Sequence, residues 1–243
     1  DLIPSATTIN FVGDGNDEAQ EFDGITADFE NDVDSVDVNV ANKGTEAKAV
    51  TIQAINVENA ASVAINASDL GTELGEGLTV TDALEIDDAT SLTISANAAV
   101  TLSGGVAGGS TDLAEIDASD AAGVDFDTVN DVASGGVEVE LSDGNDTFTL
   151  GGGAGSGSVV LDAGSGNDTI DLLGIANDQD NEITLGTGSD TLSMSASGSG
   201  NDVVTDFAAG AGGDSINFDD SLISGASTTL TGFTSLSGSV SGS

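Results

Sequence analysis

The sequence predicts an all-β protein whose short strands coil around a common core, and three observations support this prediction. Apolar and polar residues alternate over short segments, and such segments recur about every ten residues with Gly, Asn, Asp and Ser between them. No segment combines helix caps with a sustained 3.6-residue periodicity. Apolar residues make up 38% of the chain, many of them Val, Ile and Leu, which favour strands that can bury a core.

Residues 1–48 form an acidic N-terminal segment with one strand-like pattern. Val33, Val36, Val38 and Val40 come close to the alternation of a strand. Earlier, the stretch "VGDGNDE" carries Asp14 and Asp17 among glycines, and we interpret it either as a cation site or as a plain turn.

Residues 49–140 are predicted to be a β-rich body. Val50 and Ile52 begin its alternating pattern, and Leu92, Ile94 and then Val100 and Leu102 repeat it with a period of two. A solenoid and a sandwich both fit this pattern, and the small residues at the corners favour the solenoid.

Residues 141–220 contain a turn that repeats in register, and residues 221–243 follow as a Gly/Ser/Thr-rich tail or linker. The repeat consists of a glycine, an aspartate two residues later, and an apolar residue two residues after that. Successive aspartates are separated by 22, 22, 12 and 12 residues. The glycines are Gly144, Gly166, Gly188, Gly200 and Gly212, the aspartates Asp146, Asp168, Asp190, Asp202 and Asp214, and the apolar residues Phe148, Ile170, Leu192, Val204 and Ile216.

This pattern predicts a cation-binding turn followed by a short strand. Glycine lets successive carbonyl groups point into one space, and the aspartate adds charge. One turn is an incomplete cage because Ca²⁺ takes six to eight oxygens, but turns stacked about 4.8 Å apart can share an ion. A spacing of 22 residues fits one full coil with two strands and two turns, so the turn at Gly200 and Asp202 is expected on the opposite edge.

Further oxygen ligands are available beside these aspartates. Asn145, Asn167 and Asn201 precede three of them and complete the candidate metal-binding set. Asp143 either adds a ligand or is a solvated turn carboxylate.

The charge balance indicates which partners the chain can have. It carries 43 acidic residues against Lys43 and Lys48, with no His, for a formal net charge of −41, so compaction needs counter-ions. With no Arg, the chain lacks the basic groups that bind nucleic acid or an anionic membrane surface, and no apolar run reaches the length of a membrane span. The missing Cys and His argue against zinc and leave the oxygen ligands that Ca²⁺ prefers.

The missing residue types also argue against catalysis. Without His, Cys or Tyr the common general bases and nucleophile pairs are absent, so we predict that the chain is not an enzyme. No Trp or Tyr is available to hold a sugar ring beside paired carboxylates.

The repeated Gly-x-Asp-x-apolar turn resembles the nonapeptide G-G-x-G-x-D-x-U-x of RTX proteins, which forms a parallel β-roll that binds Ca²⁺. This chain departs from the nonapeptide at its first glycine, which is replaced in all five copies, and at its second glycine, which is Ser142 in one copy. Its coils of 22 residues also exceed the usual 18. The replacements of the first glycine are Leu141, Ala163, Leu185, Ser197 and Ala209. The end "NDVVTDFAAGAGGDSINF" looks like the segment that closes many RTX rolls, and residues 49–140 look like the body of RTX-type bacterial surface-layer proteins.

The resemblance implies a secreted protein, located outside the cell or on its surface, that is exported unfolded and folds on Ca²⁺. We expect an extracellular structural protein that self-assembles into a surface layer or filament, with itself as partner and cell-surface polysaccharide as a further candidate. The alternative is a calcium-dependent adhesin or glycan-binding module of a larger secreted RTX protein. No signal peptide is visible at Asp1, so a leader was removed, the chain is a piece of something larger, or export follows another route.

Overall fold

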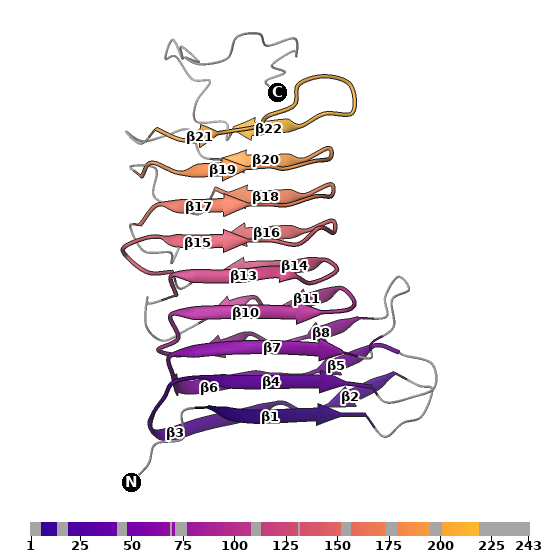
Figure 1. Ribbon diagram of the computed structural model, residues 1–243, viewed down its shortest axis with the longest axis vertical. Coiled ribbons are helices and arrows are strands. Elements are labelled where there is room, and N and C mark those ends of the chain that lie inside the picture. The colour runs from indigo at the N-terminus through magenta and orange to yellow at the C-terminus, as the bar shows by residue number, and fades with distance from the viewer. Residues whose placement is uncertain are drawn as a thin grey trace.

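The computed structural model is a parallel β-solenoid in which successive coils stack from the N-terminal end to the C-terminal end (Figure 1). It describes residues 6–218 except 14–18, 43–47, 69, 71–76, 108–112, 131, 152–156, 174–178 and 195–200. All the strand pairs in this part of the chain are parallel, and it contains no helix, hence no helix long and apolar enough to cross a bilayer. The all-β prediction is therefore confirmed.

One strand of each coil contributes to a nine-stranded sheet, here the first sheet, which runs the length of the stack. Its strands are β1 (Thr7–Val12), β4 (Val36–Ala41), β7 (Ser62–Ser68), β10 (Ser91–Ala96), β13 (Glu115–Asp120), β15 (Val137–Glu140), β17 (Val159–Asp162), β19 (Glu182–Thr184) and β21 (Val203–Val204).

The other strands form a 13-stranded second sheet. One row of it consists of β2 (Gln20–Phe22), β5 (Val50–Ile52), β8 (Leu78–Val80), β11 (Val100–Leu102), β14 (Val124–Val129), β16 (Thr147–Leu150), β18 (Thr169–Leu172), β20 (Thr191–Met194) and β22 (Ser215–Phe218). A shorter row consists of β3 (Ile25–Val33), β6 (Ile55–Ala60), β9 (Leu84–Ile86) and β12 (Val106–Ala107). The two rows meet at β14, which pairs with both β11 and β12.

Coil length changes along the stack. Near the N-terminus, hydrogen-bonded asparagines on neighbouring coils are 29 residues apart for Asn10 and Asn39, and 27 for Asn39 and Asn66. Near the C-terminus, the partners Asp146 and Asp168 are 22 residues apart, which confirms the predicted coil. The extra residues of the earlier coils include the strands of the shorter row, which are β3, β6, β9 and β12.

The core lies between the two sheets and is filled by the inward residues of each strand. Val36, Val38 and Val40 are fully buried, as their alternation predicts. Phe126 and Phe148 meet edge to face, with ring centroids 5.9 Å apart, where the three-strand coils change to two-strand coils. The two alternatives for residues 49–140 are thereby decided in favour of the solenoid, because each strand pairs with its counterpart in the next coil.

Both sheets continue across residues 48 and 140, which are the segment boundaries predicted from the sequence. β4 pairs with β7 and β2 with β5, so the acidic N-terminal segment contributes the first coils of the same stack. β13 pairs with β15 and β14 with β16, which joins the body to the coils that carry the repeated turn.

Candidate metal centre

Four of the predicted aspartates stack in a column along one edge of the solenoid. Asp146, Asp168, Asp190 and Asp214 each come directly before a strand of the second sheet, namely β16, β18, β20 and β22. Their side chains face inward because the apolar residue two positions later faces the core, and Phe148, Ile170 and Leu192 are fully buried. We call these four residues the aspartate column.

Hydrogen bonds link each member of the column to the coil before it. The Oδ1 atom of Asp168 accepts the backbone N–H of Asp146 at 2.8 Å, and Oδ1 of Asp190 accepts that of Asp168 at 2.9 Å. Asp214 accepts the N–H of Asp190 at 3.1 Å, and Asp146 accepts that of Val124 at 2.7 Å. One oxygen of each carboxylate therefore fixes the register of the stack.

The second oxygens of the two middle aspartates accept no hydrogen bond from an N–H or O–H group, although the Asp214 carboxyl lies within hydrogen-bonding reach of the Asp190 carboxyl. Asp168 and Asp190 are each only 1% exposed, and their Oδ2 atoms are buried without any hydrogen bond. A buried carboxylate oxygen without a compensating positive group is costly, so a proton or a cation stabilises this arrangement.

Burial also shifts the proton affinity of the column. It raises the pKa of Asp168 from 3.8 to about 7, against the lowering effect of the Asp146 N–H, and the charges of Asp146 and Asp190 raise it further. The pKa values of Asp190 and Asp146 are raised as well, again chiefly by burial.

Glycine is required where neighbouring turns of the column touch. A Cβ atom added to Gly188 would overlap the carbonyl oxygen of Gly166, and one added to Gly166 would overlap that of Gly144. Both glycines also have positive φ, 143° at Gly166 and 151° at Gly188. The same added Cβ atoms would lie 3.0 Å from Asp168 Oδ1 and 3.2 Å from Asp190 Oδ1, so each glycine lies beside both the neighbouring turn and a carboxylate.

Outside the column, the predicted asparagines form an exposed ladder of their own. Asn145 Oδ1 accepts the backbone N–H of Asn167 at 2.7 Å, and Asn167 Oδ1 accepts that of Ser189 at 2.9 Å. These amide oxygens join successive coils, and Asp143 is an exposed turn residue.

The turn at Asp202 lies on the opposite edge, half a coil from the column, as its spacing predicts. Asp202 Oδ1 accepts the side-chain N–H of Asn181 at 2.7 Å and its backbone N–H at 3.2 Å. Asn201 donates its backbone N–H to Asp180 at 2.8 Å. Gly200, Asp14 and Asp17 fall outside the described residues.

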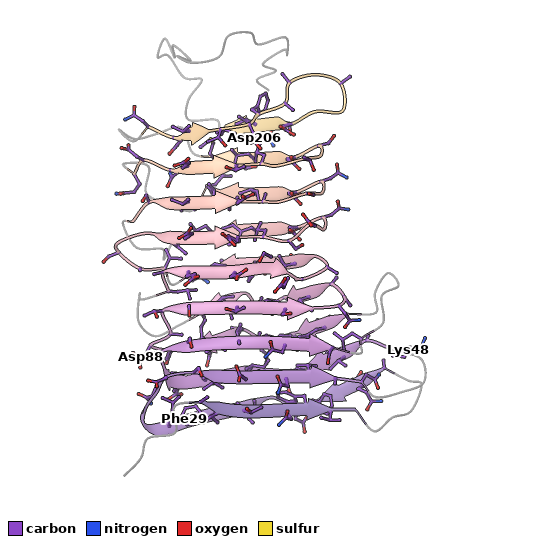
Figure 2. All side chains as sticks on the ribbon, viewed as in Figure 1. Phe29, Lys48, Asp88 and Asp206 are labelled. Carbon is purple, nitrogen blue, oxygen red and sulfur yellow. The ribbon has the colours of Figure 1, made fainter. Side chains whose placement is uncertain are left out.

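Two further residues, Ser142 and Asp206, make hydrogen bonds at the edge of the aspartate column and were not predicted from the sequence. Ser142 donates its backbone N–H and its hydroxyl to Asp146, both at 2.8 Å. Asp206, labelled beside β21 and β22 in Figure 2, accepts the N–H groups of Leu185 at 2.8 Å and Gly186 at 2.7 Å. Ser142 stood out only as a departure from the repeat, and Asp206 belongs to no repeated position.

The donor set fits a hard cation that takes part of its ligands from the backbone. Within the described part of the chain, no three acidic side chains lie close enough together to hold a metal ion by themselves. The unpartnered carboxylate oxygens and the neighbouring glycine carbonyls are all oxygen donors, as Ca²⁺ prefers. No protein-family model, curated protein or solved structure matches this chain.

The raised pKa of Asp168 predicts how stability depends on pH without calcium. The folded protein binds the proton of Asp168 more tightly than the unfolded chain between pH 3.8 and about 7, so its stability decreases as pH rises through that window. We expect melting temperatures in calcium-free buffer to fall from pH 5 to pH 8. Asp168→Asn should flatten this dependence, because asparagine does not titrate. The repulsion among the other carboxylates grows with pH in both proteins alike, so it does not account for a difference between their slopes. Identical slopes for the two proteins would contradict the prediction.

Proposed function

We propose that this chain is an extracellular structural protein that folds when Ca²⁺ binds its RTX-like aspartate column, and that copies then assemble into a surface layer or filament. The observation that carries the proposal is the pair of buried, unpartnered Oδ2 atoms of Asp168 and Asp190. They mark a place where the folded protein requires positive charge that its own side chains do not supply.

The Asp168 and Asp190 carboxylates and the carbonyl oxygens of the adjacent glycine turns would hold the ion. Bound Ca²⁺ would neutralise the buried carboxylates and cross-link neighbouring coils. The net charge of −41 acts in the same direction, because it opposes compaction until counter-ions bind. Because the proposed fold requires bound Ca²⁺, we place the protein outside the cell. Calcium there is sufficient for sites with dissociation constants of about 10⁻⁴ to 10⁻³ M, the range of extracellular calcium-binding modules.

Both ends of the solenoid leave strand edges that no described strand covers, and such edges support contact between copies. At the C-terminal end, the side chains of Asp206 and Asp214 accept backbone N–H groups of the preceding coil. At the N-terminal end, no described strand covers the outer edges of β1, β2 and β3, and the core residues Phe22 and Phe29 are only partly buried. Figure 2 labels Phe29 at this end. An open edge offers backbone hydrogen bonds and apolar surface to another chain.

The proposal assigns no catalytic role to the chain, because His, Cys and Tyr are all missing. Its partner is a second copy, with cell-surface polysaccharide as a further candidate. Neither nucleic acid nor membrane insertion enters the proposal.

Electron microscopy after a calcium titration tests the assembly step. We expect purified protein to form ordered sheets or fibres in millimolar Ca²⁺ and to disperse when a chelator is added. The same ionic strength in Mg²⁺ is the control for charge screening. Protein that binds Ca²⁺, stays monodisperse and retains a glycan would favour the adhesin alternative, and protein indifferent to Ca²⁺ would contradict the proposal.

A further inference from the structure

The ends and the middle of the aspartate column satisfy their oxygens differently. Asp146, at the first turn, uses both oxygens: Oδ1 accepts from Val124 N and the Ser142 hydroxyl, and Oδ2 accepts from Ser142 N at 2.8 Å. Asp214, at the last turn, also uses both, with Asp190 N on Oδ1 and Ala208 N on Oδ2 at 2.7 Å. Only Asp168 and Asp190 retain an unpartnered oxygen.

Ser142 accounts for the difference at the first turn. It lies four residues before Asp146, and the same position is Gly164 before Asp168 and Gly186 before Asp190. The two glycines have φ of 82°, which Ser142 does not share. Their N–H groups turn away from the column, from Gly164 to Asp162 and from Gly186 to Asp206. Ser142 instead directs both its N–H and its hydroxyl at Asp146.

These N–H and O–H donors stabilise the buried carboxylate of Asp146, as a cation would stabilise those of Asp168 and Asp190. A carboxylate that accepts hydrogen bonds on both oxygens has little lone-pair capacity left for an ion. The positive ends of the N–H and O–H groups also occupy the space from which a cation would approach.

We infer that Ser142 closes the first turn of the column to divalent cations, and that Ca²⁺ binding is confined to Asp168 and Asp190. This inference rests on the proposed function and narrows it. Ser142 is a built-in substitute for an ion, and it sets how many ions the column takes. The first coil of the column is thereby stable without calcium, while the next two coils depend on it.

Calcium stoichiometry of the full chain, measured by isothermal titration calorimetry and equilibrium dialysis with Ca²⁺ alone, tests the inference. Ser142→Gly restores the residue found at the next two turns and leaves Asp146 without its side-chain donor. We expect it to bind about one more ion than the unaltered protein. Ser103→Gly, at an exposed turn of an earlier coil, is the matched control and should leave the stoichiometry unchanged.

A second pair of variants keeps the test decisive if Ser142→Gly folds poorly. Asp146→Asn should leave the number of bound ions unchanged, whereas Asp190→Asn should reduce it. An unchanged stoichiometry in folded Ser142→Gly, or a reduced one in Asp146→Asn, would overturn the inference even though the protein binds calcium. An unaltered protein that binds no calcium would overturn the proposed function and the inference together.

Discussion

Asp168→Asn is expected to stabilise the calcium-free protein and to lose the stabilisation that Ca²⁺ gives at this carboxylate. Without calcium at pH 8, the substitution removes a buried charge whose Oδ2 has no partner, and asparagine keeps the oxygen that accepts the Asp146 N–H. We expect a gain of about 1 to 3 kcal/mol, because the amide that replaces the carboxylate carries no charge to bury. At a free Ca²⁺ concentration 100 times the dissociation constant, the variant forfeits up to about 2.7 kcal/mol for one lost site.

Thermal unfolding followed by far-UV circular dichroism, with chelator and with millimolar Ca²⁺, measures both effects. Glu138→Gln is the matched control, because it removes one negative charge from an exposed position of β15. Its two shifts should be small and should have the same sign. An Asp168→Asn variant whose melting temperature rises with Ca²⁺ as much as that of the unaltered protein would contradict a cation at this carboxylate.

Gly188→Ala is expected to destabilise the folded protein by roughly 2 to 5 kcal/mol, from a steric overlap together with an unfavourable φ. The new Cβ would collide with the Gly166 carbonyl oxygen of the neighbouring coil, at a φ of 151°. Relief requires the two turns to separate, which moves the carbonyl groups beside Asp190. Calcium affinity should therefore fall together with stability.

Gly135→Ala provides the comparison, since a Cβ added at Gly135 meets no atom within 4 Å. Denaturant unfolding and calcium titration of the two variants separate a general effect of alanine from the loss of turn stacking. Equal stabilities for the two variants would show that the turns are not packed as described. A destabilised Gly188→Ala with unchanged calcium affinity would place the ion elsewhere.

The uncovered strand edges at the ends of the solenoid bear on how copies meet. A contact at the N-terminal end would cover β1, β2 and β3 and shield the partly buried Phe22 and Phe29. Because both partners are strongly acidic, such a contact depends on calcium or another counter-ion as much as on backbone pairing. The assembly proposal and the folding proposal therefore share one requirement, which is a counter-ion for the acidic chain.

The strand class, the 22-residue coil and the position of Asp202 on the opposite edge follow from the amino-acid sequence alone. Alternation at Val36, Val38 and Val40 predicts inward residues because successive side chains of a strand point to opposite faces. The interval from Asp146 to Asp168 predicts stacking because residues one coil apart must align. The turn at Asp202 follows from the same periodicity, half a coil further on.

Which carboxylate oxygens of the aspartate column accept hydrogen bonds could not be read from the sequence. Ser142 and Asp206 are distinguished from ordinary polar residues by the N–H and carboxylate groups that they meet, and those contacts depend on the direction of the backbone in each turn. The continuity of the acidic segment with the later coils was also hidden, because coils of 27 to 29 residues share no sequence repeat with coils of 22. Periodicity reports which residues align along the stack, whereas hydrogen-bond satisfaction depends on local turn geometry that no spacing encodes.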